Sequence, residues 1–209
     1  MYNRIVVLTS GGIDSNVLLA RALKRCHEVY PVYIRAGLVW ERAELYWLKR
    51  FLGRIKNRRL MPLMILDLPF RDLLPGGWAI TGKKTPGYFS RDEEVELTGR
   101  NLLLLSKAAV FCAIKRIPVI AIGSLAGNPF PDATSSFFRG FGRVASQALG
   151  RPIRVTAPFL DLKKREVLQK GEDLPLHLSF SCLRPKGLKP CGNCNKCAER
   201  KAVAAHRQP

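Results

Sequence analysis

Short apolar runs alternate along most of the chain with stretches in which apolar residues recur every three or four positions. The continuous apolar runs predict buried strands over residues 5–8, 29–34, 63–68, 119–122 and 153–156. The periodic stretches predict a helix that ends near Arg25 and further helices over residues 41–52, 101–115, 135–149 and 162–170. Alternating strands and helices indicate an α/β fold, namely a doubly wound parallel sheet with helices on both faces.

Three features depart from this regular alternation. Gly140 and Gly142 interrupt the helix predicted over 135–149, so its middle is its weakest part. Residues 69–99 are rich in Gly, Pro and Thr, and a segment of that length without regular structure predicts an active-site flap or lid. Beyond Gly171 the composition shifts to Pro and Cys. We therefore predict one domain over residues 1–171 and a terminal cysteine module over residues 172–209, closed by a helix over 197–205.

The first predicted strand runs directly into the sequence Ser-Gly-Gly-Ile-Asp-Ser and then into a helix. The two glycines lack a Cβ, so the backbone can turn sharply and bring its N–H groups against an anion, while the serines add hydroxyl donors. The helix that follows adds the positive end of its dipole. This pattern predicts a phosphate-binding loop made of Leu8, Ser10, Gly11, Gly12, Asp14 and Ser15.

The spacing of this loop separates it from two common nucleotide motifs. Neither the Gly-x-x-x-x-Gly-Lys-Ser/Thr P-loop nor the Gly-x-Gly-x-x-Gly dinucleotide fingerprint occurs in the chain. The loop resembles instead the signature of the PP-loop ATP pyrophosphatases, which cleave ATP between its α and β phosphates.

Four of the six cysteines lie within sixteen residues near the end of the chain, as Cys182, Cys191, Cys194 and Cys197. Four thiolates match the tetrahedral coordination of Zn²⁺ and leave no open position, so the predicted zinc site is structural. An iron–sulfur cluster is the alternative, because Cys-x2-Cys-x2-Cys also occurs in ferredoxins. Cys26 and Cys112 lie on predicted helices among apolar neighbours and are expected to be packing residues.

Charge and hydropathy restrict the setting in which the protein works. The 209 residues carry a formal net charge of +19, which attracts nucleotides, nucleic acid or acidic proteins. The basic clusters are dispersed and lack interleaved aromatic residues, so RNA contact remains open beside a simply solvated basic surface. No apolar stretch reaches membrane-spanning length, and the amino-terminal residues lack the apolar region of a secretory signal. We expect a cytoplasmic protein.

The phosphate loop and the cysteine module together resemble one family, the 7-cyano-7-deazaguanine synthases of queuosine biosynthesis. The resemblance extends over nearly the full chain and includes Arg100-Asn101, Ile122-Gly123, Pro131-Asp132, the stretch from Pro158 to Lys164, and Ser181-Cys182. The chain differs from the family in the loop over residues 123–134, where Phe130 stands in place of the usual Tyr, and Ala133 and Thr134 replace Cys and Arg.

The resemblance implies an adenine-nucleotide α-hydrolase-like sheet with a carboxy-terminal zinc site. It also implies an ATP-dependent carbon–nitrogen ligase that converts 7-carboxy-7-deazaguanine and ammonia into a nitrile through an acyl-adenylate. In that reaction Mg²⁺ would bridge the ATP phosphates near Asp14, and Lys164 would neutralise the leaving charge. Arg100 would pair with a carboxylate, Asn101 would contact the substrate, and Asp132 would accept hydrogen bonds from a guanine-like edge.

Several alternatives remain open at this stage. A PP-loop enzyme that adenylates a tRNA base before thiolation would suit the basic charge, with Cys112 or Cys26 as the sulfur carrier. An amide-forming relative that acts on another carboxylate, or a non-enzymatic zinc-containing binding protein, would also fit. A homodimer is compatible with the sequence.

Overall fold

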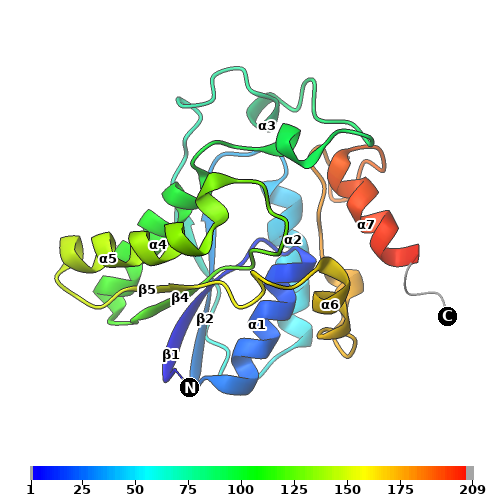
Figure 1. Cartoon of the computed structure of the whole chain (residues 1–209). Helices are drawn as coiled ribbons and strands as arrows, with labels where there is room; N and C mark the ends of the chain where they lie inside the picture. The colour runs from blue at the N-terminus through cyan, green and yellow to red at the C-terminus, as the bar shows by residue number, and fades with distance from the viewer. Residues whose placement is uncertain (1, 206–209) are drawn as a thin grey trace.

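The computed structural model describes residues 2–205 and contains one five-stranded sheet in which every pair of neighbouring strands is parallel (Figure 1). The order of the strands across the sheet is β3-β2-β1-β4-β5. The strands are β1 (Arg4–Leu8), β2 (Glu28–Arg35), β3 (Met64–Asp67), β4 (Val119–Ala121) and β5 (Arg154–Thr156). The predicted α/β class is confirmed.

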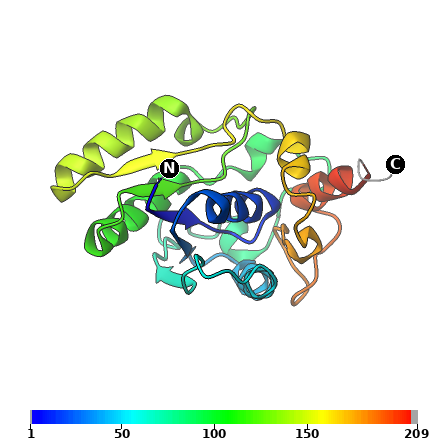
Figure 2. The same cartoon turned by 90° about the horizontal axis from the view of Figure 1, so that it is seen from below.

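Two apolar clusters cover the two faces of this sheet. Along β1, Ile5 and Val7 point to one cluster, whereas Val6 and Leu8 point to the other, as strand periodicity requires. Helices α1 (Ile13–Arg25) and α2 (Glu41–Arg54) lie against the first cluster. Helices α4 (Arg100–Lys115) and α5 (Ser135–Leu149) cover the opposite face (Figure 2). None of the described helices is long and apolar enough to cross a bilayer.

The strand order reverses direction beside β1. The chain builds β1, β2 and β3 outward on one side and then returns to place β4 on the other side of β1. In open parallel sheets the connections at such a point leave in opposite directions, which opens a crevice outside the carboxyl ends of the strands. The predicted phosphate-binding loop follows β1 and lies at this crevice.

The helix predicted over 135–149 is confirmed, and it runs through Gly140 and Gly142 without a break. Gly142 faces β5, and a Cβ there would lie 3.1 Å from the carbonyl oxygen of Ile153. The missing side chain therefore allows close packing of α5 on β5, which overrides the low helix propensity of glycine. Two other helix boundaries shift by about two residues, to α6 (Lys164–Gln169) and α7 (Asn195–Ala205).

The segment 69–99 is ordered around two short helices, α3 (Trp78–Thr81) and the 3-10 helix η1 (Asp92–Val95). It arches over one end of the sheet and reaches toward α7 (Figure 1), and it shares a third apolar cluster with the cysteine module. Trp78 stacks on Trp40 with ring centroids 5.6 Å apart. Two further 3-10 helices, η2 (Pro131–Ala133) and η3 (Leu176–Leu178), lie in the later loops. The cysteine module is thus packed onto the sheet domain through this segment.

Candidate functional site

The loop after β1 is held by its own serines. Gly11 adopts a φ of +78°, and a Cβ there would lie 3.2 Å from the carbonyl oxygen of Glu44. The Ser15 hydroxyl donates to the Gly12 carbonyl at 3.0 Å and accepts from the Ser10 N–H at 3.3 Å. Helix α1 begins directly after Gly12, which supplies no side-chain cap. The first amides of α1 therefore have no side-chain cap, which leaves them available to an anion, as predicted for a phosphate-binding loop.

A cavity of about 210 Å³ opens above this loop. Seven residues predicted from the sequence line it, namely Leu8, Ser10, Gly12, Asp14, Ser15, Arg100 and Asn101. Its apolar side is formed by Leu8 with Ile34, Leu104 and Ile122. Gly11 forms the turn behind the cavity, while Lys164 and Asp132 are not among its lining residues. The structure thus brings the phosphate loop and the start of α4 to one place.

Asp14 and Lys164 form an ion pair at the edge of the cavity. The Lys164 Nζ lies 2.7 Å from Asp14 Oδ2. Burial raises the pKa of Asp14, and the lysine only partly offsets that effect. Burial opposes the charged form of Lys164, but the attraction of Asp14 and Glu199 outweighs it and raises the lysine pKa. Asp14 Oδ1 is buried and has no partner among the described residues, and such an oxygen fits a divalent cation.

Sequence reasoning missed a buried carboxylate on the opposite wall. Glu44 lines the cavity, and Tyr33 donates its hydroxyl hydrogen to Glu44 Oε2 at 2.7 Å. Burial is the main cause that raises the pKa of Glu44 to about 7, although Arg100 and Tyr33 lower it. The available signal was its position, because Glu44 falls on the same helix face as the buried Leu48 and Phe51. A carboxyl group on the buried face of a helix is a candidate functional residue, because acidic side chains are rarely buried without a specific role.

Arg100 and Asn101 open α4 in different roles. Arg100 lines the cavity, and its Nε is buried without a partner among the described residues. A guanidinium with an unused donor at a cavity wall can take an anionic ligand.

Asn101 instead binds Asp132, which follows β4 by way of a loop. The Asn101 backbone N–H donates to Asp132 Oδ2 at 2.8 Å, and its side-chain amide donates to Asp132 Oδ1 at 3.1 Å. Both carboxylate oxygens of Asp132 are therefore engaged at the start of α4. A direct contact of Asp132 with substrate stays a prediction.

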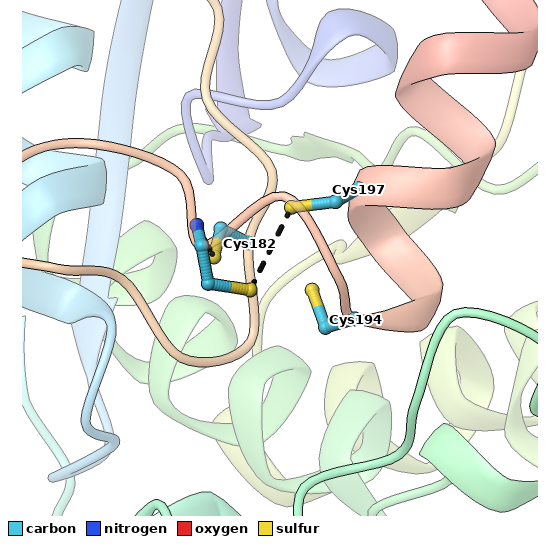
Figure 3. A group of neighbouring side chains, drawn as sticks. Cys182, Cys194 and Cys197 are labelled. Atoms are coloured by element: carbon cyan, nitrogen blue, oxygen red, sulfur yellow. Dashed lines mark hydrogen bonds between the residues drawn. The ribbon is translucent and has the colours of Figure 1, made fainter.

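The four cysteines of the module converge as their spacing predicts. Their sulfur atoms all lie within 4.8 Å of one another, and Figure 3 shows three of them, Cys182, Cys194 and Cys197, pointing to one centre. The Cys191 N–H donates to Cys182 Sγ at 3.2 Å, and the Leu183 N–H donates to Cys194 Sγ at 3.4 Å. Such N–H donors favour thiolates, and the set fits a tetrahedral metal ion. Cys26 and Cys112 are buried in the apolar clusters, as predicted.

The sheet order, the loop and the cavity define the class of PP-loop proteins with an adenine-nucleotide α-hydrolase-like fold. Among solved structures, a 4-thiouridine synthetase in complex with RNA and bound ATP is similar in fold, with a TM-score of 0.55 and 18% identity over 97% of this chain and 50% of that one. A predicted tRNA methyltransferase subunit from Methanocaldococcus jannaschii has a TM-score of 0.51 at 14% identity, over 81% of this chain and 74% of that one.

Sequence comparison narrows the class to one family. A family model described as "Queuosine biosynthesis protein QueC" matches residues 4–207. The 7-cyano-7-deazaguanine synthase 1 of Desulfitobacterium hafniense is 32% identical over 99% of this chain and 94% of its own length. The 7-cyano-7-deazaguanine synthase of Methanothrix thermoacetophila is 31% identical over 95% of this chain and 92% of its own length. The chain belongs to the QueC family, and the predicted resemblance is confirmed.

Proposed function

We propose that this protein converts 7-carboxy-7-deazaguanine and ammonia into 7-cyano-7-deazaguanine, with ATP cleaved to AMP and pyrophosphate. The observation that carries the proposal is the placement of the phosphate loop and Arg100 around one cavity, in a chain of the QueC family. Arg100 provides an unused guanidinium donor for a carboxylate beside a loop suited to the phosphates of a nucleotide.

The chemistry requires the carboxylate to become a better acylating group. One carboxylate oxygen attacks the α phosphorus, pyrophosphate leaves, and the acyl-adenylate is then attacked by ammonia with loss of AMP. The amide oxygen is activated in the same way, and departure of a second AMP leaves the nitrile. Catalysis of this kind depends on positioning and on stabilising the negative charge that develops on the leaving group.

The residues around the cavity divide this work. The serines and amides of the phosphate loop would hold the β and γ phosphates, and Lys164 would balance the charge of the departing pyrophosphate. The apolar side formed by Leu8, Ile34, Leu104 and Ile122 offers a surface for a flat base. Arg100 would orient the substrate carboxylate. Asn101 would act with it, held in place by Asp132.

Two metal ions complete the proposal. Mg²⁺ would be held by the unpartnered oxygen of Asp14, and when bound it would neutralise phosphate charge. Zn²⁺ would be held by Cys182, Cys191, Cys194 and Cys197 in a structural site. With four cysteines assigned to zinc and none of the six in a disulfide, the cysteines suit a reducing compartment, so we place the reaction in the cytoplasm.

The thiolation alternative gains no support from the two remaining cysteines. A sulfur-carrying cysteine works as a thiolate at an accessible position. Burial raises the pKa of Cys112 to about 12, and burial also raises the pKa of Cys26. Neither residue lines the cavity. We expect Cys112→Ala to retain nitrile formation.

Mass spectrometry of the products tests the proposal. The purified protein is incubated with 7-carboxy-7-deazaguanine, MgATP and ammonium, and the molecular mass of the deazapurine product is measured. A nitrile supports the proposal. An amide that accumulates without further conversion assigns the protein to the amide-forming relatives, and unchanged substrate beside an active control synthase rejects the assignment.

A further inference from the structure

A chain of ion pairs joins the cysteine module to the phosphate loop. Lys164 Nζ lies 2.7 Å from Asp14 Oδ2 and 2.9 Å from Glu199 Oε1. Asp14 belongs to the first turn of α1, Lys164 begins α6, and Glu199 lies on α7. Three elements that are distant in the sequence therefore meet at one ammonium group.

The network continues beyond Glu199 with alternating charge. Lys196 Nζ lies 3.0 Å from Glu199 Oε2 and 3.7 Å from Asp92 Oδ1 of the segment 69–99. Each oxygen of Glu199 thus faces a different lysine. The side chains of Lys164 and Asp14 are only about one quarter exposed, at 25% and 23%, so solvent screens their pair less than a surface pair.

A lysine needs more than one partner to be fixed in place. Its four-carbon stem is flexible and its ammonium is a point charge with three rotatable donors. With Asp14 alone, Nζ can turn about that single contact. Glu199 provides a second acceptor from a different helix and leaves one N–H for a ligand, so the two carboxylates together define where the charge lies.

Glu199 is in turn fixed by the metal-binding part of the chain. It lies two residues after Cys197, and the first turn of α7 is closed by a 3.0 Å hydrogen bond from the Ala198 N–H to the Cys194 carbonyl oxygen. The neighbouring Arg200 guanidinium donates to the Ser179 carbonyl oxygen at 2.6 Å. The position of Glu199 therefore depends on the cysteine cluster.

We propose that Glu199 is a positioning residue that holds the Lys164 ammonium against Asp14, so that the cysteine module sets the position of a charge used in ATP cleavage. The inference rests on the proposed function for the role of Lys164, whereas the placement of the ammonium itself does not depend on it. It gives the cysteine module a purpose beyond local folding.

The test compares Glu199→Gln with Lys196→Met in the full-length, metal-loaded protein. Glu199→Gln keeps size but removes the charge that faces Lys164. Lys196→Met removes the other partner of Glu199 and leaves both carboxylates at Lys164, so it is the matched control. Metal content and melting temperature are measured for each variant, together with kcat and KM for ATP from pyrophosphate release.

The readout that a purely structural role would not move is the chemical reactivity of the Lys164 amine. Brief acetylation followed by peptide mass spectrometry gives its labelling relative to Lys163, the exposed neighbour that serves as an internal reference. We expect Glu199→Gln to raise this ratio about three- to ten-fold, because the amine loses one of the two carboxylates that favour its charged form. We expect kcat to fall about ten-fold while KM for ATP stays within about two-fold. Lys196→Met leaves the ratio and kcat near wild type.

An unchanged labelling ratio in Glu199→Gln overturns the proposal, as does an equal change in both variants. If Glu199→Gln loses metal or stability, Glu199→Asp is measured in its place. This second variant keeps the charge on a shorter side chain. A labelling ratio above that of wild type supports the placement, and a ratio equal to wild type with reduced kcat contradicts it. Should the wild-type protein release no pyrophosphate, the proposed function fails, and the labelling ratio still decides where Glu199 holds the lysine.

Discussion

The backbone N–H of Phe180 donates a 2.8 Å hydrogen bond to the carbonyl oxygen of Gly11. Phe180 is buried, and it precedes Cys182 by only two residues. The stretch that enters the cysteine module is therefore hydrogen-bonded to the turn of the predicted phosphate loop. Loss of order in the module would reach the loop by this bond as well as through Lys164.

This relationship predicts that metal removal weakens nucleotide binding as well as stability. Binding free energy at a four-cysteine site stabilises the fold, and a loss of about 3 kcal/mol would lower Tm by about 6–12 °C in a chain of this size. We expect chelation to lower Tm by about 10 °C and to weaken ATP binding, measured by calorimetry and titration. Zn²⁺ added back should restore both. Full ATP affinity in the metal-free protein would show that the loop keeps its binding conformation without an ordered cysteine module.

Gly11 is predicted to tolerate no side chain. Gly11→Ala places a Cβ at positive φ, which costs about 1–2 kcal/mol, and brings it 3.2 Å from the Glu44 carbonyl oxygen and 3.3 Å from Leu48 Cβ. Gly127→Ala is the matched control, because its φ of +76° is similar but nothing lies within 4 Å of the added atom. We expect ATP affinity to fall at least about ten-fold in the first variant only. Equal ATP affinity in the two variants would contradict a phosphate loop at this turn.

Glu44 predicts a specific dependence of stability on pH. Its pKa is about 7 in the folded protein, mainly because of burial, and near its ordinary value of 4.5 when unfolded. A carboxyl whose folded pKa is raised binds more protons in the folded state, so stability is lost as pH rises from about 4.5 to 7 and is constant above that.

Glu44→Gln removes this titration while keeping an oxygen that can accept from Tyr33. Urea unfolding at pH 5 and pH 8 gives the free energy of unfolding of both proteins. Between pH 5 and pH 8 we expect wild type to lose about 1–3 kcal/mol more of this free energy than the variant does. Parallel pH dependence in the two proteins would mean that Glu44 ionises normally.

Asp132 is predicted to hold the start of α4 through Asn101, and Asp132→Asn separates this role from the direct substrate contact predicted from the sequence. Asp132→Asn removes a charge that accepts from the Asn101 N–H near the start of α4, and loss of an acid near a helix amino terminus costs about 0.3–1 kcal/mol. We expect a small fall in Tm with KM for the deazapurine unchanged. A large rise in that KM at unaltered stability would instead support the direct contact predicted from the sequence.

Local patterns in the sequence predicted the sheet, the glycine turn after β1 and the convergence of the four cysteines, because each depends on consecutive or closely spaced residues. The strand at β1 and the glycines of the loop are adjacent in the chain, and the four cysteines span sixteen residues. The role of the glycines in α5 depends on tertiary packing and was not visible in the local pattern. Gly142 was expected to weaken α5, whereas its missing side chain is what lets that helix approach β5.

Contacts between distant segments could not be predicted in this way. Glu199 meets Lys164 only because α7 packs beside α6, and nothing in the spacing of the two residues indicates the pair. The position of Glu44 could be predicted only in part. Its inward position on an amphipathic helix was visible, but its partners Tyr33 and Arg100 come from other elements and depend on the completed fold.

We propose that the loop over residues 10–15 directs attack to the α phosphorus of ATP. Phosphorus NMR of a reaction mixture with 7-carboxy-7-deazaguanine, ammonium and MgATP tests it directly, because the two cleavage positions give different products. We expect AMP and pyrophosphate in equal amounts, with two molecules of each for every molecule of nitrile formed. Accumulation of ADP and inorganic phosphate would contradict it.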